Sequence, residues 1–208
     1  MAPNFLIDGP DRAKHSILLA HGAGAPMDSP ALTAMAKSLA DVGFRVARFE
    51  FDYMASRRTS SSRKPPPRAE TLKPEYEAAI EALKARGPLI IGGKSMGGRV
   101  ASMIADERRA AGLLCLGYPF HPVGKPTQLR TAHLAGLKTP ALIVQGTRDP
   151  FGTRDEVATY TLSKAIKILW LEDGDHDLRP RKAVSGFSMA DHLKTMAATT
   201  AAWAAKIT

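Results

Sequence analysis

Short apolar runs alternate with longer stretches of mixed polarity along the chain. Each run has the length of a buried strand, and together they predict strands at residues 16–20, 44–51, 88–91, 111–117, 141–145 and 166–171. The stretches between them predict helices at residues 31–42, 73–86, 99–106, 154–162 and 188–206. Strands and helices that alternate in this way favour an α/β protein with a mostly parallel, doubly wound sheet in a three-layer α/β/α sandwich.

The helical spacing is clearest in residues 73–86. Tyr76, Ile80 and Leu83 recur on one helix face, and Gly87-Pro88 follows directly as a stop signal. The next strand begins there. Because open parallel sheets bind ligands beyond the carboxyl ends of their strands, the loops that follow the strands are where we expect a functional site.

One such loop carries a Gly-x-Ser-x-Gly motif. The run Gly93-Lys94-Ser95-Met96-Gly97 follows the apolar residues 88–91 directly and precedes the predicted helix 99–106. This order of strand, turn and helix is typical of a nucleophile elbow, in which glycines make room for a sharp turn that exposes the serine hydroxyl. Ser95 is therefore the candidate nucleophile.

A phosphate-binding loop is the competing interpretation of the same residues. Gly93-Lys94-Ser95 copies the end of Gly-x-x-x-x-Gly-Lys-Ser, but the first glycine of that motif would fall on Pro88. The intervening residues 89–92 are mostly apolar and belong in a buried strand. The sequence therefore favours the elbow.

A serine hydroxyl becomes an effective nucleophile when a base takes its proton and a carboxylate orients that base. Asp149 follows the predicted strand 141–145, and His176 follows the last predicted strand, 166–171. In the order Ser95, Asp149, His176 the serine comes first, whereas histidine or aspartate comes first in other well-known serine triads. We expect these three side chains to form a catalytic triad.

Other histidines and acids compete for two of these roles. The remaining histidines are His15, His21, His121, His133 and His192. None of them follows the last strand, and His21 is better placed to brace the glycine-rich turn that comes after it. Asp155 is the main alternative to Asp149 but is predicted to lie within a helix, whereas Asp173, Asp175 and Asp177 are too near His176 in sequence to reach its far ring nitrogen easily.

These motifs make the chain resemble the α/β-hydrolase superfamily over nearly its whole length. They are Gly93–Gly98, Gln145-Gly146-Thr147-Arg148-Asp149-Pro150 and Gly174-Asp175-His176. The resemblance is strongest to compact members similar to dienelactone hydrolases or serine aminopeptidases. Dienelactone hydrolases have cysteine as nucleophile where this chain has Ser95, so their substrate is not carried over.

The resemblance implies an oxyanion hole and leaves little room for a cap. The backbone N–H groups of Met96 and Ala23 would form the hole, with Gly24 as the alternative to Ala23. Residues 118–139 are too few for a large cap domain. Tyr118 and Phe120 in this segment either line a substrate pocket, together with Gly24, or pack against the sheet, and the sequence leaves both interpretations open.

Length and composition predict one soluble domain spanning residues 1–208. The chain is 44% hydrophobic and 24% charged, with no apolar run of membrane-spanning length and no recognisable secretion signal, so we expect a cytoplasmic protein. Its single cysteine, Cys115, lies in an apolar run and is predicted to be a buried strand residue. We expect no cofactor and no metal, and the oligomeric state stays open.

Positive charge is concentrated in residues 56–68. The chain has a formal net charge of +9, and this segment contributes Arg57, Arg58, Arg63, Lys64 and Arg68 beside four serines and three prolines. A solvated loop is the favoured interpretation, with attraction of an anionic substrate as the alternative. No nucleic-acid fold or stacking aromatic accompanies it.

We therefore expect a serine hydrolase that cleaves a small ester, thioester or amide. The partner would be a small-molecule acyl substrate. The alternative is a non-catalytic scaffold with a hydrolase-like fold that binds its partner through the basic segment.

Overall fold

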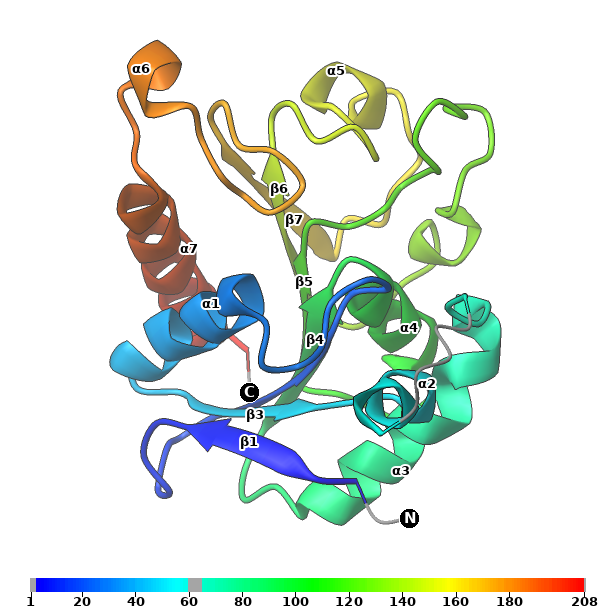
Figure 1. The fold of residues 1–208 in the computed structure, drawn as a ribbon, viewed down its shortest axis with the longest axis vertical. Coiled ribbons are helices and arrows are strands. Elements are labelled where there is room, and N and C mark those ends of the chain that lie inside the picture. Colours follow the sequence, from blue (N-terminus) through cyan, green and yellow to red (C-terminus); the bar gives the residue numbers. More distant parts are fainter. Residues whose placement is uncertain (1–2, 60–64, 208) are drawn as a thin grey trace.

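A computed structural model describes residues 3–59 and 65–207, and the strands in these ranges form one seven-stranded sheet (Figure 1). They are β1 (Phe5–Asp8), β2 (Ser16–Ala20), β3 (Arg45–Phe49), β4 (Leu89–Lys94), β5 (Gly112–Leu116), β6 (Ala141–Gly146) and β7 (Ile166–Leu171). Their order in the sheet is β1-β3-β2-β4-β5-β6-β7. Every neighbouring pair is parallel except β1 and β3, which confirms the predicted mostly parallel, doubly wound sheet.

Helices cover both faces of this sheet. Figure 1 shows α1 (Pro30–Asp41) and α7 (Met189–Ala204) on one side, and α3 (Lys73–Leu83) and α4 (Met96–Ile104) on the other. The shorter helices are α2 (Asp52–Ala55), α5 (Arg154–Val157) and α6 (Lys182–Ser185), and single 3-10 turns lie at Ser56–Arg58, Ala69–Leu72 and Ala132–Leu134. The segment after β5 holds only the last of these turns and no large cap domain.

Alternate residues of each central strand belong to different layers of the core. In β2, Leu18 packs with the cluster beneath α3 and α4, whereas Ile17 and Leu19 pack with the cluster beneath α1 and α7. Because both faces of β2 are covered, all five of its residues are buried. This explains why the strand is a continuous apolar run with no alternation of polarity.

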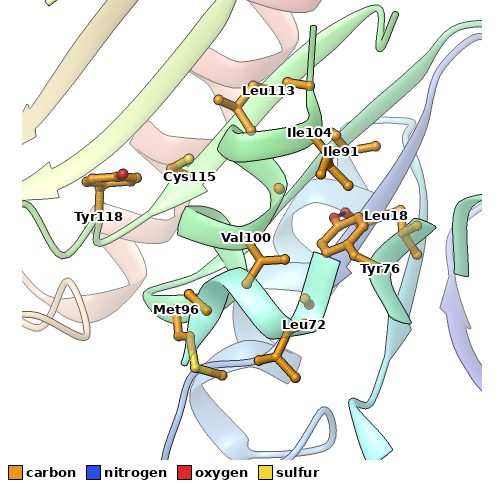
Figure 2. Packing of buried hydrophobic residues seen from close by; sticks show 14 of the residues in the cluster. Leu18, Leu72, Tyr76, Ile91, Met96, Val100, Ile104, Leu113, Cys115 and Tyr118 are labelled. Atoms are coloured by element: carbon orange, nitrogen blue, oxygen red, sulfur yellow. Dashed lines mark hydrogen bonds between the residues drawn. The ribbon is translucent and has the colours of Figure 1, made fainter. Parts of the chain in front are cut away.

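Tyr76 ties helix α3 to two strands. Figure 2 shows its ring among Leu18 and Ile91, inside the cluster beneath α3 and α4. Its single hydroxyl proton has two acceptors within reach, the carbonyl oxygens of Leu18 and Gly92 at 2.8 and 2.7 Å, and its oxygen accepts the Gly92 N–H at 2.8 Å. The one polar atom of this side chain is therefore satisfied at the place where β2 meets β4.

Besides the short helices α2 and α6, which were not predicted, two elements differ from the sequence prediction. Strand β1 was not predicted, because its apolar run, Phe5-Leu6-Ile7, is only three residues long; it pairs at the sheet edge, and Leu6 and Ile7 are exposed there. Helix α5 ends at Val157 and does not reach residue 162, because Tyr160 N–H bonds to Val157 O and closes a turn that the helix does not continue. The other predicted helices and strands are present with ends shifted by a few residues.

None of the helices in the described residues is both long enough and apolar enough to cross a membrane.

Candidate active site

Ser95 lies at the single residue between β4 and α4. Its backbone has φ 51° and ψ −115°, a strained conformation for a residue with a side chain. The glycines beside it are required by close packing: a Cβ on Gly93 would lie 2.4 Å from the Ala20 carbonyl oxygen, and one on Gly97 would lie 2.5 Å from the same atom. The elbow therefore fits only because both positions lack side chains.

The three residues expected to form a triad lie together. The Nε2 atom of His176 is 2.8 Å from Ser95 Oγ, and its Nδ1 atom is 2.8 Å from Asp149 Oδ2. The side chain of Asp149 is fully buried, whereas that of His176 is 21% exposed. The result is a continuous hydrogen-bonded chain from a buried carboxylate to an accessible hydroxyl.

The Asp149 carboxylate receives further hydrogen bonds that its burial requires. Gln145 donates through Nε2 to Oδ2 at 2.9 Å, and the Phe151 N–H donates to Oδ1 at 2.9 Å. The amide oxygen of Gln145 accepts the Tyr118 N–H at 2.7 Å, which fixes the orientation of that amide. A buried charge is tolerated only when paired or hydrogen-bonded, and Gln145 is part of that arrangement. In the sequence, Gln145 stood out only as the first residue of the motif that contains Asp149, at the end of an apolar strand, and no role was predicted for it.

The loop that carries His176 is held tightly against the end of β6. A Cβ on Gly146 would lie 2.2 Å from the carbonyl oxygen of Gly174, so this approach needs glycine. Asp173 accepts from the side chains of Arg181 and Arg148. Hydrogen bonds from Arg181, the larger cause, together with the positive charge of both arginines lower the pKa of Asp173 to about 2. The loop is therefore fixed on both sides of His176.

Lys94 adds a further contact to the same loop. Its ammonium lies 3.2 Å from Asp177 Oδ1, and its side chain is only 9% exposed. Burial lowers the pKa of Lys94, and the negative charge of Asp177 acts in the opposite direction. This ion pair links the elbow residue before Ser95 to the residue after His176, a contact that was not predicted from the sequence.

The glycine-rich turn after β2 is braced by two aromatic side chains. His21 lies with Nδ1 2.6 Å from the Gly22 carbonyl oxygen, and its Nε2 accepts the Phe51 N–H at 3.1 Å. The Tyr53 hydroxyl donates to the Ala23 carbonyl oxygen at 3.0 Å. These contacts agree with the structural role predicted for His21, which is to support the turn. Since a trans peptide directs its N–H opposite to its C=O, these bonds turn the N–H groups of Ala23 and Gly24 away from the two aromatic residues.

Two cavities meet at Ser95. One, of about 500 Å³, is lined by Gly24, Leu32, Lys94, His176 and Asp177 among others. The second, of about 330 Å³, is lined by Arg68, Glu70, Met96, Arg99, Pro119 and Arg130 among others. Ala23, Ser95 and Phe151 line both. The serine hydroxyl can therefore be approached from two sides.

Tyr118 and Phe120 do not line either cavity. Both side chains are fully buried, and their rings contact each other edge-on at 4.9 Å. The sequence left open whether these residues line a substrate pocket or pack against the sheet, and in the structure they are packed in the interior. Pro119, which lies between them, is the residue that faces the smaller cavity. Gly24 lines the larger cavity.

The competing histidines lie elsewhere or have other partners. His133 bonds with Ser102, His192 with the Leu178 carbonyl oxygen and His121 with the Pro122 carbonyl oxygen. His15 is buried beside Phe44. Among the acids, Asp155 lies exposed on α5, and Asp175 accepts N–H groups of its own loop.

Two further features predicted from the sequence can be located in the structure, Cys115 and part of the basic segment. Cys115 is fully buried in β5, as predicted, and burial raises the pKa of its thiol. In the basic segment, Arg58 pairs with Asp28 and Glu50, and Arg68 lines the smaller cavity. Arg63 and Lys64 lie outside the described residues.

Comparison with known proteins extends these observations. A putative protein-lysine deacylase, ABHD14B, from Pongo abelii is 28% identical over 145 residues, which are 69% of this chain and 66% of that protein. The match thus spans slightly less than two-thirds of the relative's length.

Solved structures have the same fold at low identity. A serine hydrolase without a lid from Xanthomonas campestris has a TM-score of 0.72 at 18% identity, covering 97% of this chain and 89% of that one. A dienelactone hydrolase from Anabaena variabilis has a TM-score of 0.72 at 19% identity, covering 100% and 99%.

A family model described as an alpha/beta hydrolase domain matches residues 13–205, nearly the whole chain. Together with the parallel sheet and the elbow between β4 and α4, this match makes the protein a member of the alpha/beta hydrolase family.

Proposed function

We propose that the protein is a serine hydrolase that cleaves a small ester, thioester or amide through an acyl-enzyme on Ser95. The observation that carries this proposal is the hydrogen-bonded chain from Asp149 through His176 to Ser95 Oγ, with 2.8 Å at each link. Activation of a serine needs a base within hydrogen-bond reach and a group that orients the base. Both conditions are met by these contacts.

In the proposed reaction, His176 accepts the Ser95 proton through Nε2 as the hydroxyl oxygen attacks the acyl carbonyl. Asp149 holds the imidazole through Nδ1–H and stabilises its charged form. His176 then gives the proton to the leaving group, and the carbonyl re-forms as the acyl-enzyme. Water, deprotonated by His176, attacks this ester and releases the acid together with free Ser95.

The oxyanion that forms in each tetrahedral intermediate would be bound by the N–H groups of Met96 and Ala23. Met96 is the first residue of α4, so its N–H has no partner within the helix. The bonds from His21 and Tyr53 hold the peptide groups of the turn in a fixed orientation before substrate arrives. Losing one oxyanion donor typically costs about 10²–10³ in rate, which makes this fixed orientation valuable.

The first test is reaction with a fluorophosphonate, followed by the mass of the intact protein. The wild type should gain one adduct, Ser95→Ala should gain none, and His176→Ala should react far more slowly. Ser163→Ala is a suitable control, because this serine lies away from the site and bonds to Leu137 O. Absence of an adduct on the folded wild type would favour a non-catalytic scaffold.

Turnover then tests Asp149. Asp149→Asn should lower kcat by about 10⁴, because the amide cannot hold the imidazole in the same tautomer. Aryl esters, acyl thioesters and acyl-lysine peptides form the substrate panel; the last are included because the matched relative is a putative protein-lysine deacylase. Near-unchanged turnover in Asp149→Asn would remove this residue from the mechanism.

A further inference from the structure

The smaller cavity beside Ser95 has an unusual charge balance. Three arginines line it, Arg68, Arg99 and Arg130, against a single carboxylate, Glu70. The formal surplus is two positive charges within one cavity that opens onto the candidate nucleophile. The remaining lining residues are mostly apolar, including Met96 and Pro119.

Arg130 is the cation in this cavity with unused hydrogen-bonding capacity. Within the described parts of the chain its guanidinium forms no hydrogen bond or salt bridge, although the side chain is only partly exposed. Its backbone is fixed on both sides: its N–H donates to Phe120 O at 2.7 Å, and its carbonyl accepts the Tyr118 hydroxyl at 2.9 Å. The buried Tyr118 and Phe120 therefore hold Arg130 at the cavity.

Arg99 and Arg130 are close enough for their charges to oppose each other. Burial, and after it the positive charge of Arg99, lowers the pKa of Arg130. Arg99 donates to Glu70 through Nη2, but its Nε is buried without a hydrogen-bond partner in the described residues. Two neighbouring guanidinium groups of like charge, of which that of Arg130 has no hydrogen-bond partner in the described residues, are the chemical complement of a carboxylate, which accepts two parallel N–H bonds.

The position of His176 indicates which part of the substrate, the acyl group or the leaving group, occupies the smaller cavity. His176 lines the larger cavity and not the smaller one. Because the histidine must give its proton to the leaving group, the leaving group belongs in the larger cavity. The acyl group, which stays on Ser95, then occupies the smaller cavity with the arginines.

We propose, building on the proposed hydrolase function, that the preferred acyl group ends in a carboxylate and that Arg130, assisted by Arg99, binds this anion. The substrate class is therefore a half-ester, half-thioester or half-amide of a dicarboxylic acid. Arg130 is a specificity-determining residue in this scheme. The apolar lining accommodates the methylene groups between the two carbonyl carbons.

The test compares esters that share one leaving group. The 4-nitrophenyl monoesters of glutaric and adipic acid are measured against the same compounds with the distal carboxylate capped as a methyl ester. The wild type should prefer the free acids by at least about tenfold in kcat/KM, as expected for a hydrogen bond to a charged group. High salt should reduce this preference, because it screens the charges.

Variants at position 130 locate the preference. Arg130→Gln should lower the ratio of the two kcat/KM values by about 10- to 100-fold, whereas Arg130→Lys should retain part of it because it keeps the charge but not the planar fork. Arg12→Gln removes the same charge from an exposed position before β2, at the opposite end of the sheet from Ser95, and should leave the ratio unchanged.

Three results would overturn the inference. They are equal kcat/KM values for free and capped esters in the wild type, an unchanged ratio in Arg130→Gln, and an equal drop in Arg12→Gln, which would indicate only the overall charge of the protein. If Arg130→Gln does not fold, the wild-type comparison and Arg130→Lys decide the matter. Absence of both ester turnover and the fluorophosphonate adduct would instead reject the hydrolase function, and this inference with it.

Discussion

At the scale of single residues, loss of the Gln145 side chain should lower both the stability of the fold and the activity of the candidate active site. Its amide donates to Asp149 and accepts from the Tyr118 backbone, and both contacts are buried. A buried N–H left without an acceptor costs about 1–3 kcal/mol. Gln145 therefore connects the segment after β5 to the position of the Asp149 carboxylate.

Replacing Gln145 with leucine tests this link. Gln145→Leu should lower the free energy of unfolding by about 1–3 kcal/mol, because the Tyr118 N–H and Asp149 each lose a partner. It should also lower kcat, since Asp149 is then held less firmly against His176. Urea unfolding and ester turnover measure the two effects. The exposed Gln128→Leu should change stability by less than about 0.5 kcal/mol; equal losses in both variants would contradict the argument.

At the scale of elements, the sequence predicted best where a strand is buried on both faces. The ranges 16–20 and 141–145 agree with β2 and, to within one residue, with β6, because a strand covered on both faces is a mostly apolar run. The edge strand β1 has an apolar run of only three residues, two of which are exposed. It is held by pairing with β3 and by the ion pair between Arg48 and Asp8, at 2.7 Å, and both depend on contacts between residues distant in sequence.

The contact between β6 and the loop after β7 gives a prediction at this scale. A Cβ on Gly146 would lie 2.2 Å from Gly174 O, so Gly146→Ala should push away the loop that carries His176. We expect a loss of about 1–3 kcal/mol in stability, as for other overpacked sites, together with reduced fluorophosphonate labelling. Thermal unfolding and labelling rates measure these losses.

Gly136→Ala is the matched control for this substitution. A Cβ at Gly136 meets nothing within 4 Å, so the substitution should leave both stability and labelling nearly unchanged. Wild-type behaviour of Gly146→Ala would mean that the loop adjusts to the added carbon and that its position is not fixed by this contact.

At the scale of the whole molecule, the parallel sheet explains why the candidate triad was predictable. Ser95, Asp149 and His176 are far apart in sequence, but each follows a strand, and the carboxyl ends of parallel strands share one edge of the sheet. The surrounding residues were not predictable in this way. The positions of Lys94 and Arg130 depend on contacts between segments distant in sequence, and a local sequence pattern does not predict such contacts.

Stability of the whole molecule should depend on pH through two histidines, the buried His21 and the half-buried His133. Burial is the main cause that lowers the pKa of His21 and His133 below the ordinary 6.5. The unfolded chain then binds more protons just below pH 6.5 than the folded protein does. Stability is therefore fully present above about pH 6.5 and is lost as the pH falls, with a slope of at most about 1.4 kcal/mol per pH unit for each group.

Urea unfolding between pH 5 and 8 measures this slope. His133→Gln should flatten the dependence below pH 6.5, because one of the two titrating groups is gone, while Ser102 keeps a side-chain partner. A slope identical to that of the wild type would show that His133 does not contribute to the pH dependence.

The two cavities that meet at Ser95 have a consequence for the timing of catalysis. In the proposed mechanism, the leaving group departs after the first half of each turnover, whereas the acyl group stays until water releases it. Contacts in the larger cavity therefore act on one chemical step, and contacts in the arginine-lined cavity act on both. A change in the leaving group should alter the rate of acylation of Ser95, whereas a change in the acyl group should also alter the rate of deacylation.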